Sequence, residues 1–196
     1  MARTPTFDRD AVARAARAVF WSNGYEAASI PALELATGLS RSSIYNSFGS
    51  KRGLFDAAVA NYLAEVVEPL LAPLRHDPVP PDAVFAYLEV LRQKLIDPGS
   101  MTSLNGCMLV SVAGSPIARD TTVARAIADY RDTMRSALAN GIQAHAPNVG
   151  ATEVGRLAAI VTGMVISALA LARIAPLDAA DTMTAAAAIV AEANKT

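Results

Sequence analysis

A run of short or planar polar side chains between residues 41 and 47 is the segment best suited to binding chemistry. Its members are Arg41, Ser42, Ser43, Tyr45, Asn46 and Ser47. On a helix, these positions face outward, carry no acid and can enter a major groove. Arginine can donate two hydrogen bonds to guanine O6 and N7, and hydroxyl and amide groups can reach base edges or phosphates. Double-stranded DNA is therefore a candidate partner.

Two short helices joined by a tight turn are predicted around this run. Ser29 can cap a helix whose first turn tolerates Pro31 and which ends at Gly38. Gly38 permits the turn, Leu39 fills the junction, and Ser40 caps the second helix. The expected core of the pair is Ile30, Leu33, Ala36, Ile44 and Phe48. The spacing predicts a helix-turn-helix.

A first helix over residues 8–22 is expected to support this pair, capped by Asp8 and ended by Gly24. A fourth helix begins at Lys51 and runs towards Pro69 or Pro73. Later helices are predicted over 82–96, with Asp82 as its cap, and over 106–114, 120–145, 151–174 and 178–194. The expected fold is all-α, with an N-terminal three-helix domain (residues 1–50) and a C-terminal helical domain (residues 51–196).

Composition and charge agree with this division. The 196 residues are 53% hydrophobic and 6% aromatic, with a formal net charge of −1. Residues 1–55 contain seven Lys or Arg and four acids, whereas the remainder is acidic on balance. The first quarter is thus the part expected to face a polyanion. The single cysteine, the start MARTPTFDRD and a longest uncharged, mostly apolar run of only 16 residues (157–172) indicate a cytoplasmic protein that does not span a membrane.

The stretch GYEAASIPALELATGLSRSSIYNSFGSKRGLF, residues 24–55, resembles the DNA-binding domain of TetR/AcrR regulators. The resemblance is strong over about residues 8–56 and rests on the number of helices beyond them. It implies base contacts from Arg41, Ser42 and Ser43 and phosphate contacts from Tyr45, Asn46 and Lys51. Ser29 is a further phosphate candidate because it begins a helix. Glu34, Pro31 and Leu35 depart from the family's usual residues.

The same resemblance implies a regulator of transcription, most often a repressor released from a palindromic operator when a small molecule binds its C-terminal domain. The helices at 151–174 and 178–194 are expected to form a homodimer, because the first is apolar on nearly every side. Candidate ligand contacts are Phe85, Tyr87, Leu91, Met108, Met134 and Met164. No cofactor or metal site is expected, and the sequence lacks the residue clusters of an enzyme.

Several of these residues also have a purely structural interpretation. Tyr45 could pack on the first helix, Asn46 could be a solvated amide, Arg52 an ordinary exposed charge, and the ligand candidates plain core. Cys107 begins a predicted helix, where amides and the helix dipole activate a thiol, so a thiol-based electrophile or redox sensor acting through the same DNA-binding domain is an alternative. A helical carrier or enzyme that has lost DNA binding, suggested by Glu34, is another.

Overall fold

The computed structural model describes residues 7–195, and its regular elements within that range are all helical. Arg3, one of the basic residues counted above, lies outside them. The elements are α1 (Arg9–Ala27), α2 (Ile30–Thr37), α3 (Arg41–Phe48), α4 (Lys51–Tyr62), the π-helical turn η1 (Leu63–Val67), α5 (Glu68–Leu71), η2 (Ala72–Arg75), α6 (Ala83–Ile96), α7 (Met101–Asn105), α8 (Met108–Ala113), η3 (Pro116–Arg119), α9 (Thr121–His145), α10 (Ala151–Leu171), α11 (Pro176–Glu192) and η4 (Ala193–Lys195). The all-α prediction is confirmed.

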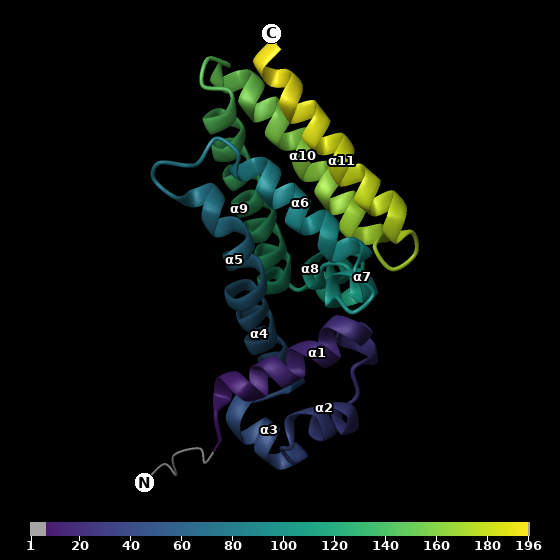
Figure 1. Ribbon diagram of the computed structural model, residues 1–196. Coiled ribbons are helices and arrows are strands. Elements are labelled where there is room, and N and C mark those ends of the chain that lie inside the picture. The colour runs from purple at the N-terminus through teal and green to yellow at the C-terminus, as the bar shows by residue number, and fades with distance from the viewer. Residues whose placement is uncertain (1–6, 196) are drawn as a thin grey trace.

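The helices form a small head and a larger bundle (Figure 1). Helices α1, α2 and α3 make up the head at one end of the molecule. Helix α4 packs on α1 and continues through η1 into the bundle, where α11 packs on α6 and α10, and α10 packs on α9. Helices α10 and α11 lie side by side along the outer side of the bundle. One helical stretch therefore connects the two parts.

The helix ends in the head follow the predicted capping chemistry. Asp8 accepts from the amide of Asp10 at 2.9 Å, and Ser29 accepts from that of Ala32 at 3.2 Å. Ser40 accepts from the amide of Ser43 at 3.3 Å. Gly38 ends α2 with φ 69°, a left-handed conformation that glycine adopts without strain. Each cap satisfies amides that have no partner within their own helix.

Several local predictions are wrong. Asp82 precedes α6 but makes no capping hydrogen bond, and Ala36 is exposed rather than part of the core. Helix α7 was not predicted, because its five residues are too few to show a helical period. Gly24 takes a left-handed conformation (φ 74°) as expected, but helical residues resume after it up to Ala27.

Aromatic rings join the head to the helix that leaves it. Phe55 of α4 meets Phe20 edge to face, with ring centroids 5.2 Å apart, and meets Tyr25 at 5.1 Å. Trp21 meets Tyr62 edge to face at 4.9 Å. Such pairs add about 0.5–1.5 kcal/mol to the burial of their apolar surface. The core of the head thus continues along α4 into the core of the bundle.

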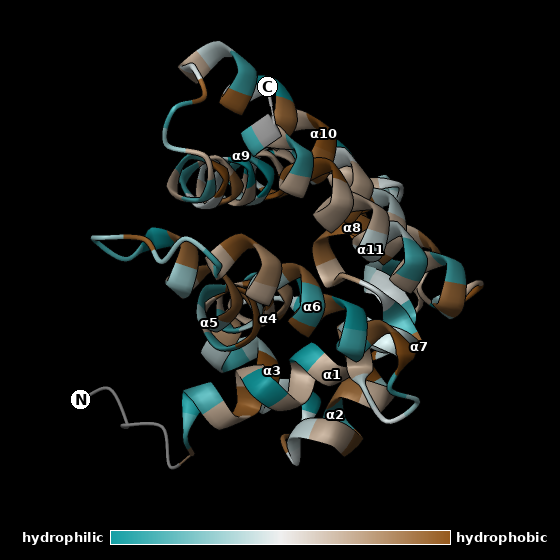
Figure 2. Cartoon of the chain, turned by 45° about the horizontal axis from the view of Figure 1, so that its top comes forward, coloured by the Kyte–Doolittle hydropathy of each residue, from teal (hydrophilic) through white to brown (hydrophobic). Residues whose placement is uncertain are grey.

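One side of helix α10 is apolar and lies inside the bundle. Brown, hydrophobic segments mark it in Figure 2. By length and composition, Ala151–Leu171 and the stretch Lys51–Arg75 could each cross a membrane. Val161 and Val165 are nevertheless fully buried in the fold, and α10 packs against α9 and α11. Burial within the protein therefore explains the hydropathy of this face of α10.

Gly53 allows α3 and α4 to approach closely. A Cβ atom at this position would lie 1.9 Å from the carbonyl oxygen of Phe48, a backbone atom that cannot rotate away. We expect Gly53→Ala to destabilise the protein by about 1–3 kcal/mol, the cost of overpacking. Urea denaturation followed by circular dichroism measures the change.

Gly155→Ala is the matched control. It lies within α10, where a Cβ meets nothing within 4 Å, so the better helix propensity of alanine should stabilise by about 0.5–1 kcal/mol. Equal effects of the two substitutions would contradict the packing argument.

Candidate nucleic-acid interface

Helix α3 presents a polar face to solvent. Arg41, Ser42, Tyr45 and Asn46 are exposed, and Ser43 is half-buried. On the opposite side, Ile44 and Phe48 are buried in the core of the head and fix the rotation of the helix. The predicted contact residues between 41 and 46 therefore share one helix, whereas Ser29 caps α2 and Lys51 begins α4. Between Arg41 and Phe48 the helix contains no acidic residue.

Hydrogen bonds hold the start of α3. The hydroxyl of Ser40 lies 2.9 Å from that of Ser42 and 3.0 Å from that of Ser43. The carboxylate of Glu34 accepts from the backbone amide of Arg41 at 2.5 Å. An acid at this place satisfies a free amide and favours the positive end of the helix dipole. Glu34 is thus a second cap for α3.

Two cation–π contacts orient the basic side chains. The guanidinium of Arg41 lies over the ring of Tyr45, 5.5 Å from its centroid. The ring of Tyr45 is 37% exposed, so it is available at the surface. The ammonium of Lys51 lies 4.6 Å from the centroid of Tyr25 and donates to the carbonyl of Glu26 at 3.3 Å. These contacts restrict long side chains that would otherwise move freely.

Arg9 supports the other end of α3, a role that the sequence did not reveal. It donates to the carbonyl of Ser47 at 2.6 Å, and its guanidinium lies 4.4 Å from the centroid of Phe48. A cation at the C-terminal end of a helix satisfies a free carbonyl and is favoured by the dipole. Helix α3 is therefore held at both ends.

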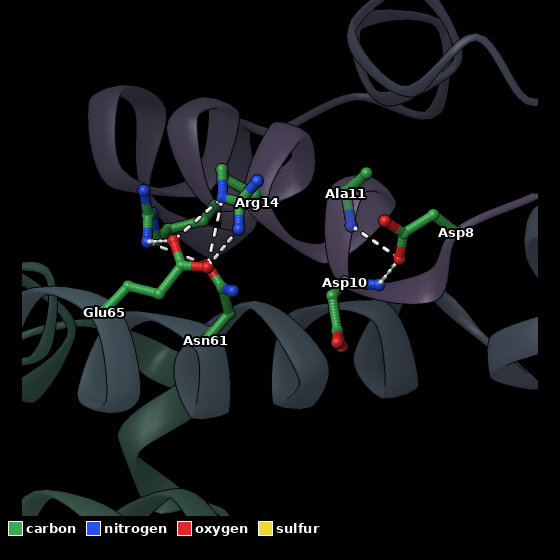
Figure 3. A network of polar contacts seen from close by, with 7 residues as sticks. Asp8, Asp10, Ala11, Arg14, Asn61 and Glu65 are labelled. Atoms are coloured by element: carbon green, nitrogen blue, oxygen red, sulfur yellow. Dashed lines mark hydrogen bonds and ion pairs between the residues drawn. The ribbon is translucent and has the colours of Figure 1, made fainter.

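An ion-pair network fastens α1 to the end of α4 (Figure 3). Arg14 donates to the carboxylate of Glu65 with Nε at 2.8 Å, and Arg17 donates to the same group at 3.0 Å. Arg17 also donates to Asn61 at 2.8 Å. The hydrogen bond from Arg14 is the main reason that the pKa of Glu65 falls to about 2. The network ties the head to the π-helical turn η1.

Three further contacts fasten the head and the start of α4 to the bundle. The indole N–H of Trp21 donates to the carbonyl of Gly106 at 3.0 Å. Glu26 accepts from the amide of Ile117 at 2.9 Å. Arg52 pairs with Asp56 on its own helix and with Asp120 at the start of α9, each at 2.8 Å. The prediction that Arg52 is an ordinary exposed charge is therefore wrong.

A small cavity lies in the bundle between α4, η1, α5, α6 and α9. Tyr87, Leu91 and Met134, three of the predicted ligand contacts, line it. Phe85 instead packs edge to face on His145 at 4.7 Å, Met108 is fully buried, and Met164 is not among the lining residues. The cavity measures about 30 Å³, enough for a water molecule.

Cys107 precedes α8, close to its predicted place at a helix start, but its side chain is buried. It is 1% exposed, and the hydroxyl of Tyr62 donates to its sulfur at 3.3 Å. The thiol in turn donates to the hydroxyl of Tyr130 at 3.5 Å. Reactive thiols are partly exposed. Within residues 7–195, no group of three or more His, Cys, Asp or Glu side chains could hold a metal ion.

A helix-turn-helix head on a helical bundle defines a class of DNA-binding regulators, and comparisons with known proteins agree. Residues 13–58 match the family model described as bacterial regulatory proteins, tetR family. The chain is 43% identical over 61 residues to the transcriptional repressor ComR of Escherichia coli K12 and 36% identical over 102 residues to the repressor AcnR of Corynebacterium glutamicum. These alignments cover 31% and 48% of this chain, and 29% and 54% of the relatives.

Solved structures resemble the whole chain. A cysteine mutant of the TetR-family regulator CifR, complexed with 26-bp operator DNA, shares 27% of its sequence with a TM-score of 0.74, covering 96% of this chain and 98% of that one. A TetR regulator from Chloroflexus aurantiacus is 26% identical with a TM-score of 0.72, covering 94% and 92%. The head thus matches the TetR family of bacterial regulators, and nearly the whole chain has the fold of solved TetR-family regulators.

The pair between Arg52 and Asp120 predicts a pH dependence of stability. Arg52 is the main reason that the pKa of Asp120 falls to about 2, below its ordinary value near 4. Because the unfolded carboxylate takes up a proton first, the stabilisation is complete above pH 4 and is lost as the pH falls towards 2. Asp120→Asn should remove this part of the acid-side loss while keeping a capping side chain.

Thermal denaturation between pH 2 and 7 measures this effect. Asp132→Asn is the control on the same helix, because Asp132 pairs with the adjacent, exposed Arg131 and with no other residue between 7 and 195. If the two variants show the same pH profile, the pair does not fasten α4 to α9.

Proposed function

We propose that the protein is a DNA-binding transcriptional regulator, a repressor that a small molecule releases from a palindromic operator. The observation that carries this proposal is the exposed, acid-free face of α3, held at both ends by Glu34 and Arg9. The match to this family supports the same conclusion. A regulator of this kind works in the cytoplasm and needs no catalytic group.

The proposed contact of each side chain, to a base or to a phosphate, follows from its position. Arg41, Ser42 and Ser43 lie at the start of α3, where a recognition helix contacts base edges. Tyr45, Asn46 and Lys51 contact phosphates, and Ser29 does the same from the start of α2. The head, residues 1–50, reads the DNA, whereas residues 51–196 dimerise and hold the ligand. Glu34 does not remove DNA competence, because its carboxylate is bonded to the helix it caps.

Dimerisation through α10 and α11 completes the DNA-binding unit. The outer side of these helices and the loop between them leave large apolar side chains exposed, namely Ile160, Leu171, Ile174 and Leu177. A two-fold dimer buries them and places two copies of α3 about 34–36 Å apart, one turn of DNA. A ligand that changes this spacing releases the operator, because it binds one arrangement better than the other.

Substitutions in the head test the proposed contacts. Lys51→Ala should weaken binding to every sequence and reduce the slope of log K against log salt by about 0.9, because one phosphate contact is lost. Arg41→Ala should cost about 1–3 kcal/mol of discrimination at one base pair. Fluorescence anisotropy with a duplex selected from a random pool measures both effects.

Arg75→Ala is the control for these variants, since it removes an exposed charge in the bundle that pairs with Glu68. Failure to select any duplex at low salt would refute the proposed function.

Dimerisation has its own test. Ile160→Glu places a charge on the outer face of α10 and should produce monomers that bind the palindrome about 100-fold more weakly, because the second head is no longer tethered. Val90→Glu alters a comparably exposed residue of α6 and should leave a dimer. Light scattering after size-exclusion chromatography measures the mass. A dimeric Ile160→Glu variant would place the interface elsewhere.

A further inference from the structure

Three buried tyrosines meet at the cavity in the bundle. The lining consists of Tyr62, Val66, Val67, Leu70, Leu71, Tyr87, Leu91, Thr102, Tyr130, Met134 and Leu169. These described residues include no charged side chain. The wall is therefore mainly hydrocarbon, with three phenol groups and one further hydroxyl, that of Thr102. Pockets of this kind use their few polar groups to orient an apolar ligand.

The hydroxyl groups of these tyrosines have sulfur partners. Tyr62 donates to the sulfur of Cys107 at 3.3 Å, and Tyr87 donates to that of Met134 at 3.6 Å. Tyr130 accepts from the Cys107 thiol, so the proton of its own hydroxyl remains available. Thiol and thioether sulfur are weak acceptors. An oxygen atom that entered the cavity would be a better acceptor for these donors than the sulfur atoms they now have.

The tyrosines act as donors at neutral pH because they stay protonated. Burial raises the pKa of Tyr62, Tyr87 and Tyr130 well above the ordinary value of 10. The lining offers no cation to balance a negative ligand, and burying an unpaired charge is costly. An uncharged acceptor suits the cavity better than a carboxylate or phosphate.

The wall that can yield is the π-helical turn η1. Val66 and Val67 belong to this turn and to the lining. A π turn has wider i→i+5 backbone hydrogen bonds and is frequent at functional sites. Because the cavity measures only about 30 Å³, a ligand larger than water has to displace this wall.

We propose that this cavity takes a small, uncharged, largely apolar molecule with a carbonyl-type oxygen, whose two lone pairs accept hydrogen bonds from Tyr62 and Tyr87. The inference rests on the proposed function in that it names the class of ligand that the regulator senses. The ligand oxygen takes over donors that now point at sulfur, and its hydrocarbon part pushes against η1. No covalent step at Cys107 is involved.

The chain contains its own reporter for this event. Trp21 is the single tryptophan, its ring meets that of Tyr62, and its N–H is bonded to Gly106 next to Cys107. A change in the environment of Tyr62 therefore alters the fluorescence of Trp21.

Three probes of similar shape test the class of ligand: cyclohexanone, methylenecyclohexane and cyclohexanecarboxylate. Binding is measured by Trp21 fluorescence and by calorimetry at pH 7 on the full chain. We expect saturable binding of the ketone, about three- to tenfold tighter than that of the alkene, since the two differ in one acceptor. The carboxylate should bind more weakly than either.

Variants assign the preference to the tyrosines. Tyr62→Phe and Tyr87→Phe should each reduce the ketone-to-alkene ratio towards one while leaving the alkene affinity unchanged. Tyr25→Phe removes a phenol hydroxyl outside the cavity and should keep the ketone preference. Circular dichroism verifies that each variant is folded, and the alkene affinity shows that its cavity is intact.

The outcomes separate this inference from the proposed function. Equal binding of ketone and alkene, tighter binding of the carboxylate, or no saturable binding of any probe overturns the ligand class, even if the same protein binds DNA. A ketone preference that survives both substitutions also overturns it. A tyrosine-dependent ketone preference in a protein that binds no DNA supports the ligand class and refutes the regulator.

Discussion

The helical stretch from Lys51 to Arg75 is the element on which the rest of the structure depends. Its first part contributes Leu54 and Phe55 to the core of the head, and its last part contributes Leu71 and Leu74 to the core of the bundle. A helix transmits displacement along its axis because its hydrogen bonds resist bending. The direction of α3 relative to the bundle is therefore determined by this one stretch and by the contacts that hold it.

The π-helical part of this stretch lies between the cavity and the contacts to the head. Within η1, Val66 and Val67 face the cavity, while Glu65 holds Arg14 and Arg17 of the head. We expect a displacement of the wall in this turn to shift the ion pairs of Glu65, because all three residues belong to the same turn. Under the proposed function, ligand binding and DNA binding then bias one equilibrium, and each weakens the other by the same factor.

The helix boundaries of the head could be predicted because capping is local. Asp8, Ser29 and Ser40 each bind an amide two or three residues away, so the signal and its partner lie in the same short segment. The contacts between head and bundle could not be predicted in this way. Trp21 binds a carbonyl 85 residues away, and Arg52 an acid 68 residues away. Nothing in the sequence pairs such residues before the fold is known.

Only some of the residues that line the cavity could be predicted from the sequence. Tyr87, Leu91 and Met134 were identified by residue type, since aromatic and sulfur-containing side chains adapt to apolar ligands. Tyr62 and Tyr130 were missed, because their role depends on the thiol of Cys107 between them, which joins α4 to α9. Cys107, a candidate reactive thiol in the sequence, accepts a hydrogen bond from Tyr62 and donates one to Tyr130.

Glu34 shows how one substitution can shift the way a reading helix works. Its carboxylate occupies the amide of Arg41 at the positive end of α3, the place where a helix would otherwise attract a phosphate. The start of α4 differs, because its cap is the neutral hydroxyl of Ser50 and its first residue is Lys51. We therefore expect the start of α4 to attract the DNA backbone more strongly than the start of α3. In the proposed complex, the start of α3 contributes mainly through side chains that contact base edges.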